Sequence, residues 1–124
     1  MADIVLDSNV VIYFCDPRHE TLRNWLKKYK LVISTISQVE VLGYHEITRM
    51  EKDLATAFFS KCRLVKIDQS IIQLAIELRQ QKKMSLGDAI IAATALDEQL
   101  PLITANTKDF EHIEKLELID PLSI

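Results

Sequence analysis

Four carboxylates stand at comparable places in the sequence, each just after an apolar run or near the start of an expected helix: Asp7, Glu40, Asp88 and Asp109. Any one of them could simply cap a helix or stabilise it by interacting with the positive, N-terminal end of its dipole, and Ser37-x-x-Glu40 fits a capping box. Four on one edge would be different, because converging carboxylates repel one another unless a cation lies among them. Mg²⁺ prefers such oxygen ligands and can stabilise negative charge on a phosphoryl oxygen.

The elements that must position these acids follow from the apolar pattern. Strands are expected at 3–7, 31–35, 63–67 and 101–105, with a fifth at 117–120. Helices are expected at 8–14, 20–29, 37–50, 51–62, 70–83, 87–99 and 108–116. The alternation predicts an α/β fold with a mainly parallel central sheet of four to five strands and helices on both faces.

Ligands of such sheets bind outside the carboxyl ends of the strands. Asp7 ends the first strand, and Glu40 lies in the first turn of the helix expected after the second strand. Asp109 follows the strand at 101–105 in the same way, so these three acids are expected at one edge. Asp88 opens a helix that follows another helix, and topology alone does not place it.

Composition sets broad limits. The chain has 124 residues, 48% of them hydrophobic, which suits one domain over 1–124. Its net charge of −3 is not typical of a nucleic-acid binder, but an acidic cation site in a nuclease would also lower the charge. Cys15 and Cys62 show no C-x-x-C spacing and are expected to be buried thiols in a reducing compartment. With no basic leader and no long apolar run, we expect a cytoplasmic protein without a membrane segment.

Several motifs are similar to those of a known family. "IVLDSNVVIYF" (4–14) resembles the opening strand and D-[ST]-N motif of PIN-domain ribonucleases, and "ISQVE" (36–40) resembles their second acidic motif. "LGDAIIAATALDEQLPLITANTKDF" (86–110) looks like their third and fourth motifs. The resemblance covers essentially the whole chain and is closest to the VapC-like toxins of bacterial type II toxin–antitoxin pairs. Gly87 stands where many relatives have proline, and Ala105 where many have a basic or polar residue.

The resemblance implies a PIN-like three-layer sandwich and an endoribonuclease that depends on Mg²⁺ or Mn²⁺ and hydrolyses RNA phosphodiester bonds. It implies Asp7, Glu40, Asp88 and Asp109 as the catalytic and metal-binding acids. It also implies polar neighbours that hold the carboxylates or a water: Ser8, Asn9, Thr104 and Asn106. The partners it implies are an RNA substrate, a cognate antitoxin protein and a second copy of the chain.

Other readings stay open at this stage. A receiver-like phosphoacceptor domain needs an Asp after its third strand, which Asp68 supplies, but it also needs an acidic pair after the first strand. Asp7 is followed by Ser8 and Asn9, so that pair is missing, as is the D-x-D of a haloacid-dehalogenase-type phosphatase. A non-catalytic PIN scaffold is the third reading. The presence of all four acids favours the nuclease.

Overall fold

Five short strands form one sheet in the order β3-β2-β1-β4-β5, and all four neighbouring pairs run parallel. The computed structural model describes residues 2–124. The strands are β1 (Asp3–Leu6), β2 (Lys30–Ser34), β3 (Arg63–Val65), β4 (Leu102–Ile103) and β5 (Leu118–Ile119). The expected parallel sheet is therefore confirmed, with the strand at 117–120 as its fifth member.

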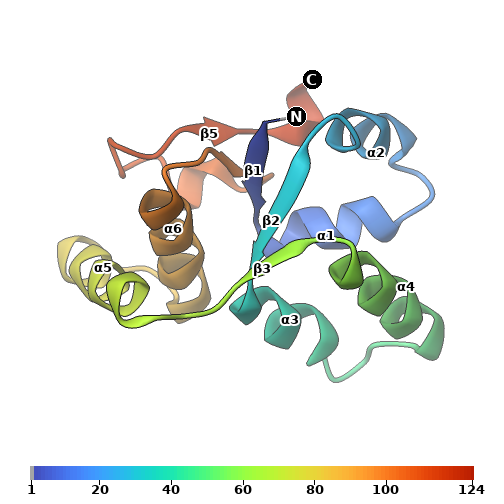
Figure 1. Cartoon of the computed structure of the whole chain (residues 1–124), viewed down its shortest axis with the longest axis horizontal. Helices are drawn as coiled ribbons and strands as arrows, with labels where there is room; N and C mark the ends of the chain where they lie inside the picture. The colour runs from blue at the N-terminus through green and yellow to red at the C-terminus, as the bar shows by residue number, and fades with distance from the viewer. Residues whose placement is uncertain (1) are drawn as a thin grey trace.

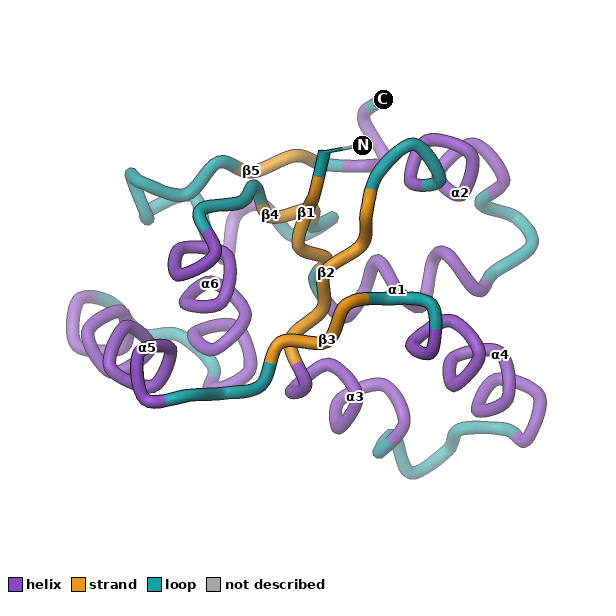
Figure 2. The backbone as a smooth tube through the Cα atoms, viewed as in Figure 1, coloured by secondary structure: helices purple, strands orange, loops and turns teal. Residues whose placement is uncertain are grey.

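Helices cover both faces of this sheet (Figures 1 and 2). Ile4 and Leu6 pack with α1, α2 and α4, whereas Val5 packs with α5 and α6 on the opposite face, as the two-residue period of a strand requires. The predicted three-layer sandwich is confirmed. The helices are α1 (Ser8–Cys15), α2 (Glu20–Leu26), α3 (Thr35–Leu42), α4 (Arg49–Ser60), α5 (Gln69–Gln81) and α6 (Leu86–Glu98).

The order of the strands creates a switch point beside β1. The chain moves outward from β1 to β2 and β3, then returns through α5 and α6 to β4 on the other side of β1. Leu6 pairs with Ile103, so the residues that follow, Asp7 and Thr104, emerge side by side. A switch point at the carboxyl edge is where open parallel sheets bind ligands.

Two predicted helices were wrong in extent. The helix expected at 37–50 begins earlier, at Thr35, and ends at Leu42, because Ser34 caps its start and Gly43 its end. The helix expected at 108–116 is only a single 3₁₀ turn, η1 (Thr107–Asp109), followed by further turns. Its apolar residues Phe110, Ile113 and Leu116 are three apart and are joined by successive i→i+3 hydrogen bonds, which suits consecutive tight turns and not an α-helix. A second 3₁₀ turn, η2 (Pro121–Ser123), follows β5.

The two cysteines do not indicate thiol chemistry. Both are free and half-buried, where full burial was expected. Burial raises the pKa of both thiols, that of Cys62 to about 11, so neither is a ready nucleophile near neutral pH. Separately, no helix within residues 2–124 has both the length and the apolar character needed to cross a membrane.

Phe110 gives a test of this core, because it is fully buried and follows Asp109 directly. Phe110→Ala should lower the free energy of unfolding by about 3–5 kcal/mol, since it removes a ring and leaves a cavity. Urea denaturation measures the loss. Leu122→Ala, at a half-exposed side chain, is the matched control and should change stability by less than about 1 kcal/mol. A similarly small effect at Phe110 would contradict this packing.

Candidate active site

The four acids come to the carboxyl edge of the sheet from four different elements. Asp7 follows β1, Glu40 lies on α3, Asp88 lies in the first turn of α6, and Asp109 ends η1. Burial is the main cause of the raised pKa of both Asp7 and Asp88, and charge repulsion adds to it: Asp88 and Glu40 act on Asp7, and Asp109 and Glu40 act on Asp88. The carboxylates are thus near enough to feel one another's charge.

Asp7 is the buried member of the group, with 6% of its surface exposed. Thr104 Oγ1 donates a hydrogen bond to its Oδ2 at 2.7 Å, and the Ser8 backbone N–H donates to its Oδ1 at 2.8 Å. Burial nevertheless raises the pKa of Asp7 to about 6, and repulsion from Asp88 and Glu40 adds to the rise. The folded chain therefore holds a carboxylate whose charge is poorly compensated.

Asp88, which topology could not place, is the acid that interacts electrostatically with all three others. It shares charge repulsion with each of Asp7, Glu40 and Asp109. Burial is the main cause of its raised pKa, and hydrogen bonding with Ser85 partly offsets the rise. Ser85 Oγ also accepts the Asp88 backbone N–H at 3.1 Å, so the cap of α6 fixes the first turn that carries this acid.

Glu40 lies in the second turn of α3 and not the first, because the helix begins two residues earlier than expected. Ser8 Oγ donates to Glu40 Oε1 at 2.7 Å, which ties α1 to α3. Ser37 Oγ lies 2.8 Å from Ser8 Oγ. A hydroxyl has one proton and a carboxylate is the stronger acceptor, so Ser8 donates to Glu40 and accepts from Ser37.

Ser37 is a residue whose place in the site the sequence did not reveal. It was interpreted as a helix cap, but Ser34 is the cap and Ser37 is fully buried inside α3. The sequence spacing could have indicated this place, because Ser37 precedes Glu40 by three residues and so faces the same side of a helix.

The remaining polar residues lie around Asp7 and at the rim. Thr104 is buried and accepts the Asn106 backbone N–H at 3.0 Å, whereas the Asn106 side chain is exposed. Asp109 is exposed, and its repulsion is felt by Asp88. Asn9 Oδ1 in the first turn of α1 is buried and accepts no hydrogen bond from the described residues. Such an oxygen, two residues from Asp7, suits a site that takes up water or a hydrated ion.

The carboxylate oxygens at this edge fit a hydrated divalent cation better than a fully dehydrated one. Within residues 2–124, no three or more His, Cys, Asp or Glu side chains stand ready as a joint set of metal ligands. Asp7 and Glu40 are each engaged by neighbouring hydroxyls. Mg²⁺ is commonly held by one or two carboxylates and keeps several waters, so the acids present match its coordination preference.

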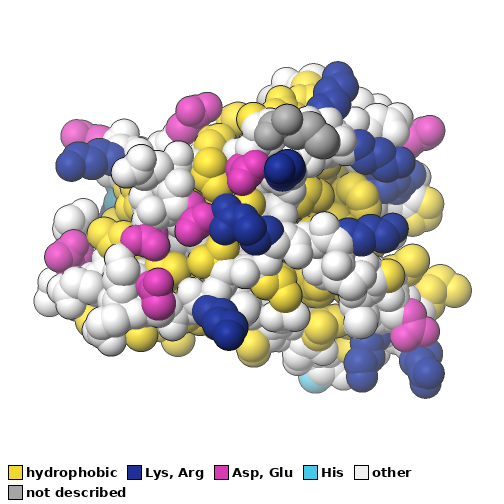
Figure 3. All heavy atoms as spheres, in the orientation of Figure 1, with side chains coloured by type: hydrophobic (Ala, Val, Ile, Leu, Met, Phe, Trp, Pro, Cys, Tyr) yellow, Lys and Arg dark blue, Asp and Glu magenta, His cyan; other side chains and the backbone are white. Residues whose placement is uncertain are grey.

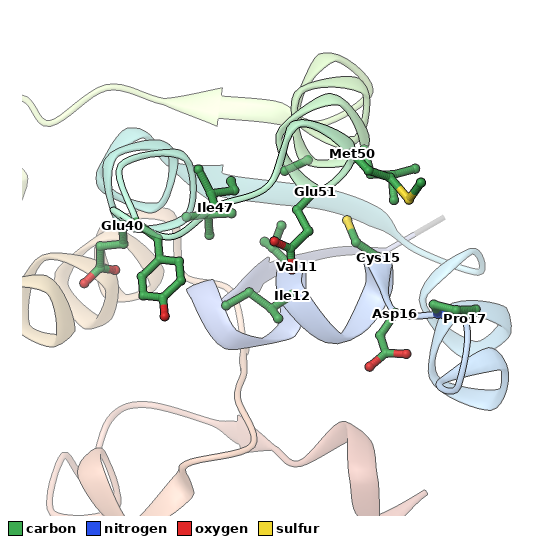
Figure 4. Close-up of a pocket in the computed structure, with 13 residues that line it drawn as sticks. Val11, Ile12, Cys15, Asp16, Pro17, Glu40, Ile47, Met50 and Glu51 are labelled. Carbon is green, nitrogen blue, oxygen red and sulfur yellow. The ribbon is translucent and has the colours of Figure 1, made fainter.

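An apolar groove of about 450 Å³ leads away from Glu40 between α1, α3 and α4. Figure 4 shows Glu40 at one end and Pro17 near the other, with Ile12 and Met50 in the walls. A second hollow of about 930 Å³ continues between α2 and α4, and both share Cys15, Pro17, Met50 and Leu54. The two hollows therefore form one surface, called here the long groove.

Basic side chains surround the far end of the long groove. Lys27, Lys30 and Lys61 line it, over apolar residues that include Leu26 and Phe58. In Figure 3 dark blue side chains ring a yellow area on the side of α2 and α4. The first hollow of the long groove thus has carboxylates in its lining, those of Glu40, Glu51 and Asp16, and the second hollow has cations.

The structure argues against the hypothesis of a receiver-like phosphoacceptor domain. Asp68 accepts the Ile71 N–H as the N-cap of α5 and is exposed. It follows β3, which is the edge strand, and β2 separates that strand from β1. Asp68 therefore cannot share a phosphoacceptor site with Asp7.

Comparisons with known proteins agree with this fold. The family model of the PIN domain matches residues 4–116. Comparison with curated protein sequences finds no match. A chain of a toxin–antitoxin complex from Klebsiella pneumoniae is 32% identical, with 95% of this chain and 97% of that chain covered and a TM-score of 0.75.

Two further structures share the fold at lower identity. DNA-bound VapBC from Salmonella typhimurium is 20% identical over 98% of this chain and 99% of that chain, with a TM-score of 0.82. VapC20 from Mycobacterium tuberculosis, described as a Sarcin-Ricin loop cleaving toxin, is 18% identical over 82% of this chain and 87% of that chain, with a TM-score of 0.62. Since the family model spans nearly the whole sequence, the chain belongs to the PIN domain family.

Proposed function

We propose that this protein is a metal-dependent endoribonuclease and the toxin of a toxin–antitoxin pair. The observation that carries the proposal is the convergence of Asp7, Glu40 and Asp88 on one edge, with Asp109 at the rim. A folded chain has no structural need to bury Asp7 among other carboxylates, and a divalent cation removes the repulsion. The similarity to VapC20, described as a Sarcin-Ricin loop cleaving toxin, supports the same activity.

In this proposal the residues divide the work by their burial. Asp7 and Asp88 hold Mg²⁺ or Mn²⁺, directly or through water, because they are the more enclosed pair. Glu40, fixed by Ser8, would hold and orient a water at the site, and Asp109 would complete the site from the rim. When bound, the cation makes water more acidic and stabilises negative charge on the phosphodiester.

The substrate is RNA, bound chiefly through its backbone. Lys82 and Lys83 are exposed and stand just before the N-terminus of α6, which carries Asp88. Lysines so placed would contact phosphates beside the acidic edge, and the binding would weaken with salt.

The proposed protein partner is an antitoxin, as in the complexes that this chain resembles. The long groove suits an extended or helical antitoxin segment with an apolar face. Charge complementarity gives that segment a direction: basic at the Glu40 end and acidic at the Lys27, Lys30 and Lys61 end. A bound segment that reaches Glu40 would also obstruct the acidic edge.

Self-association stays a prediction. Ile72, Ile76 and Leu86 are exposed apolar side chains around a hollow between α5 and α6, on the face opposite the long groove. A second copy of the chain would cover them, as expected for a homodimer.

Asp88→Asn tests the activity. Purified protein should cleave RNA with Mg²⁺ or Mn²⁺ and stop in excess EDTA, and the variant should lose more than about 100-fold, since even residues that only support metal ligands cost 10–100-fold. Mapping RNA ends by sequencing measures both the rate and the site. Asp97→Asn, on the same helix but outside the group, is the matched control. Cleavage that continues in EDTA, or survives in the variant, would favour a non-catalytic scaffold or another mechanism.

The raised pKa of Asp7 predicts an unusual pH dependence without metal. The folded carboxyl binds its proton more tightly than the unfolded one, so its ionisation, between pH 3.8 and about 6, destabilises the fold. In EDTA, stability should therefore fall from about pH 4 to pH 7, by at most about 3 kcal/mol over that whole range. Melting curves measure this. Asp7→Asn should flatten the fall, and Mg²⁺ should reduce it by stabilising the ionised form. If stability fell equally with pH in the natural protein and in Asp7→Asn, Asp7 would not be the group that causes the fall.

Leu54→Asp tests the groove, because Leu54 is 47% exposed and lines both hollows. A charge there should abolish co-purification with the antitoxin encoded beside the protein while RNA cleavage continues. Leu122→Asp, at a half-exposed residue outside both hollows, should leave the complex intact. An intact complex with Leu54→Asp would place the partner elsewhere.

A further inference from the structure

Gly87 makes close contact with the Glu40 carboxylate across two helices. It is the second residue of α6 and directly precedes Asp88. A Cβ built on Gly87 would overlap Glu40 Oε2 and would lie 2.9 Å from Cδ and 3.2 Å from Oε1. Glu40 can occupy its observed place only because this position has no side chain.

The backbone conformation does not explain the glycine. Gly87 lies within a regular α-helix, and no described glycine has a positive φ. A glycine inside a helix is less stable than alanine at the same place, because it gives up more conformational freedom. The remainder of α6 is rich in alanine, leucine and isoleucine, which favour or tolerate a helix. The space beside Glu40 is what distinguishes position 87.

Glu40 is held from the other side by the Ser8 hydroxyl, at 2.7 Å from Oε1. Its carboxylate therefore lies between a donor on α1 and the backbone of the first turn of α6. That turn carries the positive end of the helix dipole, which favours a carboxylate there. The same turn carries Asp88, so one short segment positions two of the four acids.

We propose that Gly87 is a positioning residue, whose missing side chain seats the Glu40 carboxylate beside Asp88. The inference rests on the proposed function, since the purpose of the placement is to complete the cation site. The neighbour that a methyl group would strike is the end of a flexible, exposed side chain. Substitution should therefore move Glu40 and leave the helix in place.

Gly87→Ala should separate stability from metal binding. In EDTA its melting temperature should equal or slightly exceed that of the natural chain, because alanine favours the helix. Its affinity for Mn²⁺, measured by titration calorimetry without RNA, should fall about 10–100-fold, the range typical of lost supporting contacts. Leu122→Ala, at a half-exposed residue outside the acidic edge and outside all the hollows described above, is the control and should bind Mn²⁺ as the natural chain does.

Glu40→Asp provides a double-mutant test of the contact. Its shorter side chain withdraws from position 87, so it should weaken Mn²⁺ binding in the natural chain but weaken it little further when combined with Gly87→Ala. This non-additivity is the signature of two residues acting through one contact. A merely structural glycine would give additive effects.

The outcomes distinguish the two proposals. If the natural chain binds Mn²⁺ and Gly87→Ala binds it equally well, the positioning role is overturned and the proposed function stands. A Gly87→Ala variant that melts much lower in EDTA also overturns it, because the glycine would then serve the fold. If the natural chain binds no Mn²⁺ and cleaves no RNA, both proposals fail.

Discussion

The burial of Asp7 at the end of the central strand is the constraint on which the rest of the site depends. A carboxylate with 6% of its surface exposed has lost most of its hydration, and hydrogen bonds from Thr104 and the Ser8 backbone do not restore it. Its pKa is consequently about 6. Burying this carboxylate costs free energy. The neighbouring acids indicate that the buried charge serves a functional site.

The parallel sheet explains why the acids meet at all. β1 and β4 are neighbours at the switch point, so their ends place Asp7 and Thr104 together. α3 follows directly on β2 and brings Glu40, and the Ser85 cap fixes the first turn that holds Asp88. Ser8 and Gly87 then confine the Glu40 carboxylate from two sides. The mutually repelling carboxylates are thus held in place by residues from several different elements.

Much of this arrangement was predictable from the sequence. The strands, their parallel direction and the two layers of helices follow from apolar periodicity and from the rules for α/β folds. Asp7 was also readily placed, because a polar residue directly after a buried strand must lie at the sheet edge. Asp88 was not, since a helix that follows another helix has no strand end to locate it, yet its charge is felt by, or feels, each of the other three acids.

The errors have physical causes. Ser34 competes with Ser37 as the cap of α3, and only the end of β2 decides between them. The residues after Asp109 carry apolar side chains three apart, a spacing that a short helix and a series of tight turns share. Gly87 could not be interpreted from sequence, because its role depends on Glu40, a residue 47 positions away on another helix.

The most direct test is to locate the cation. Crystals of the protein soaked in Mn²⁺ should give an anomalous difference peak at the carboxyl edge, bounded by the carboxylates of Asp7, Glu40 and Asp88 and by ordered waters. A fully occupied Mn²⁺ site elsewhere, with this edge empty in protein that cleaves RNA, would contradict the claim that these acids share a metal ion.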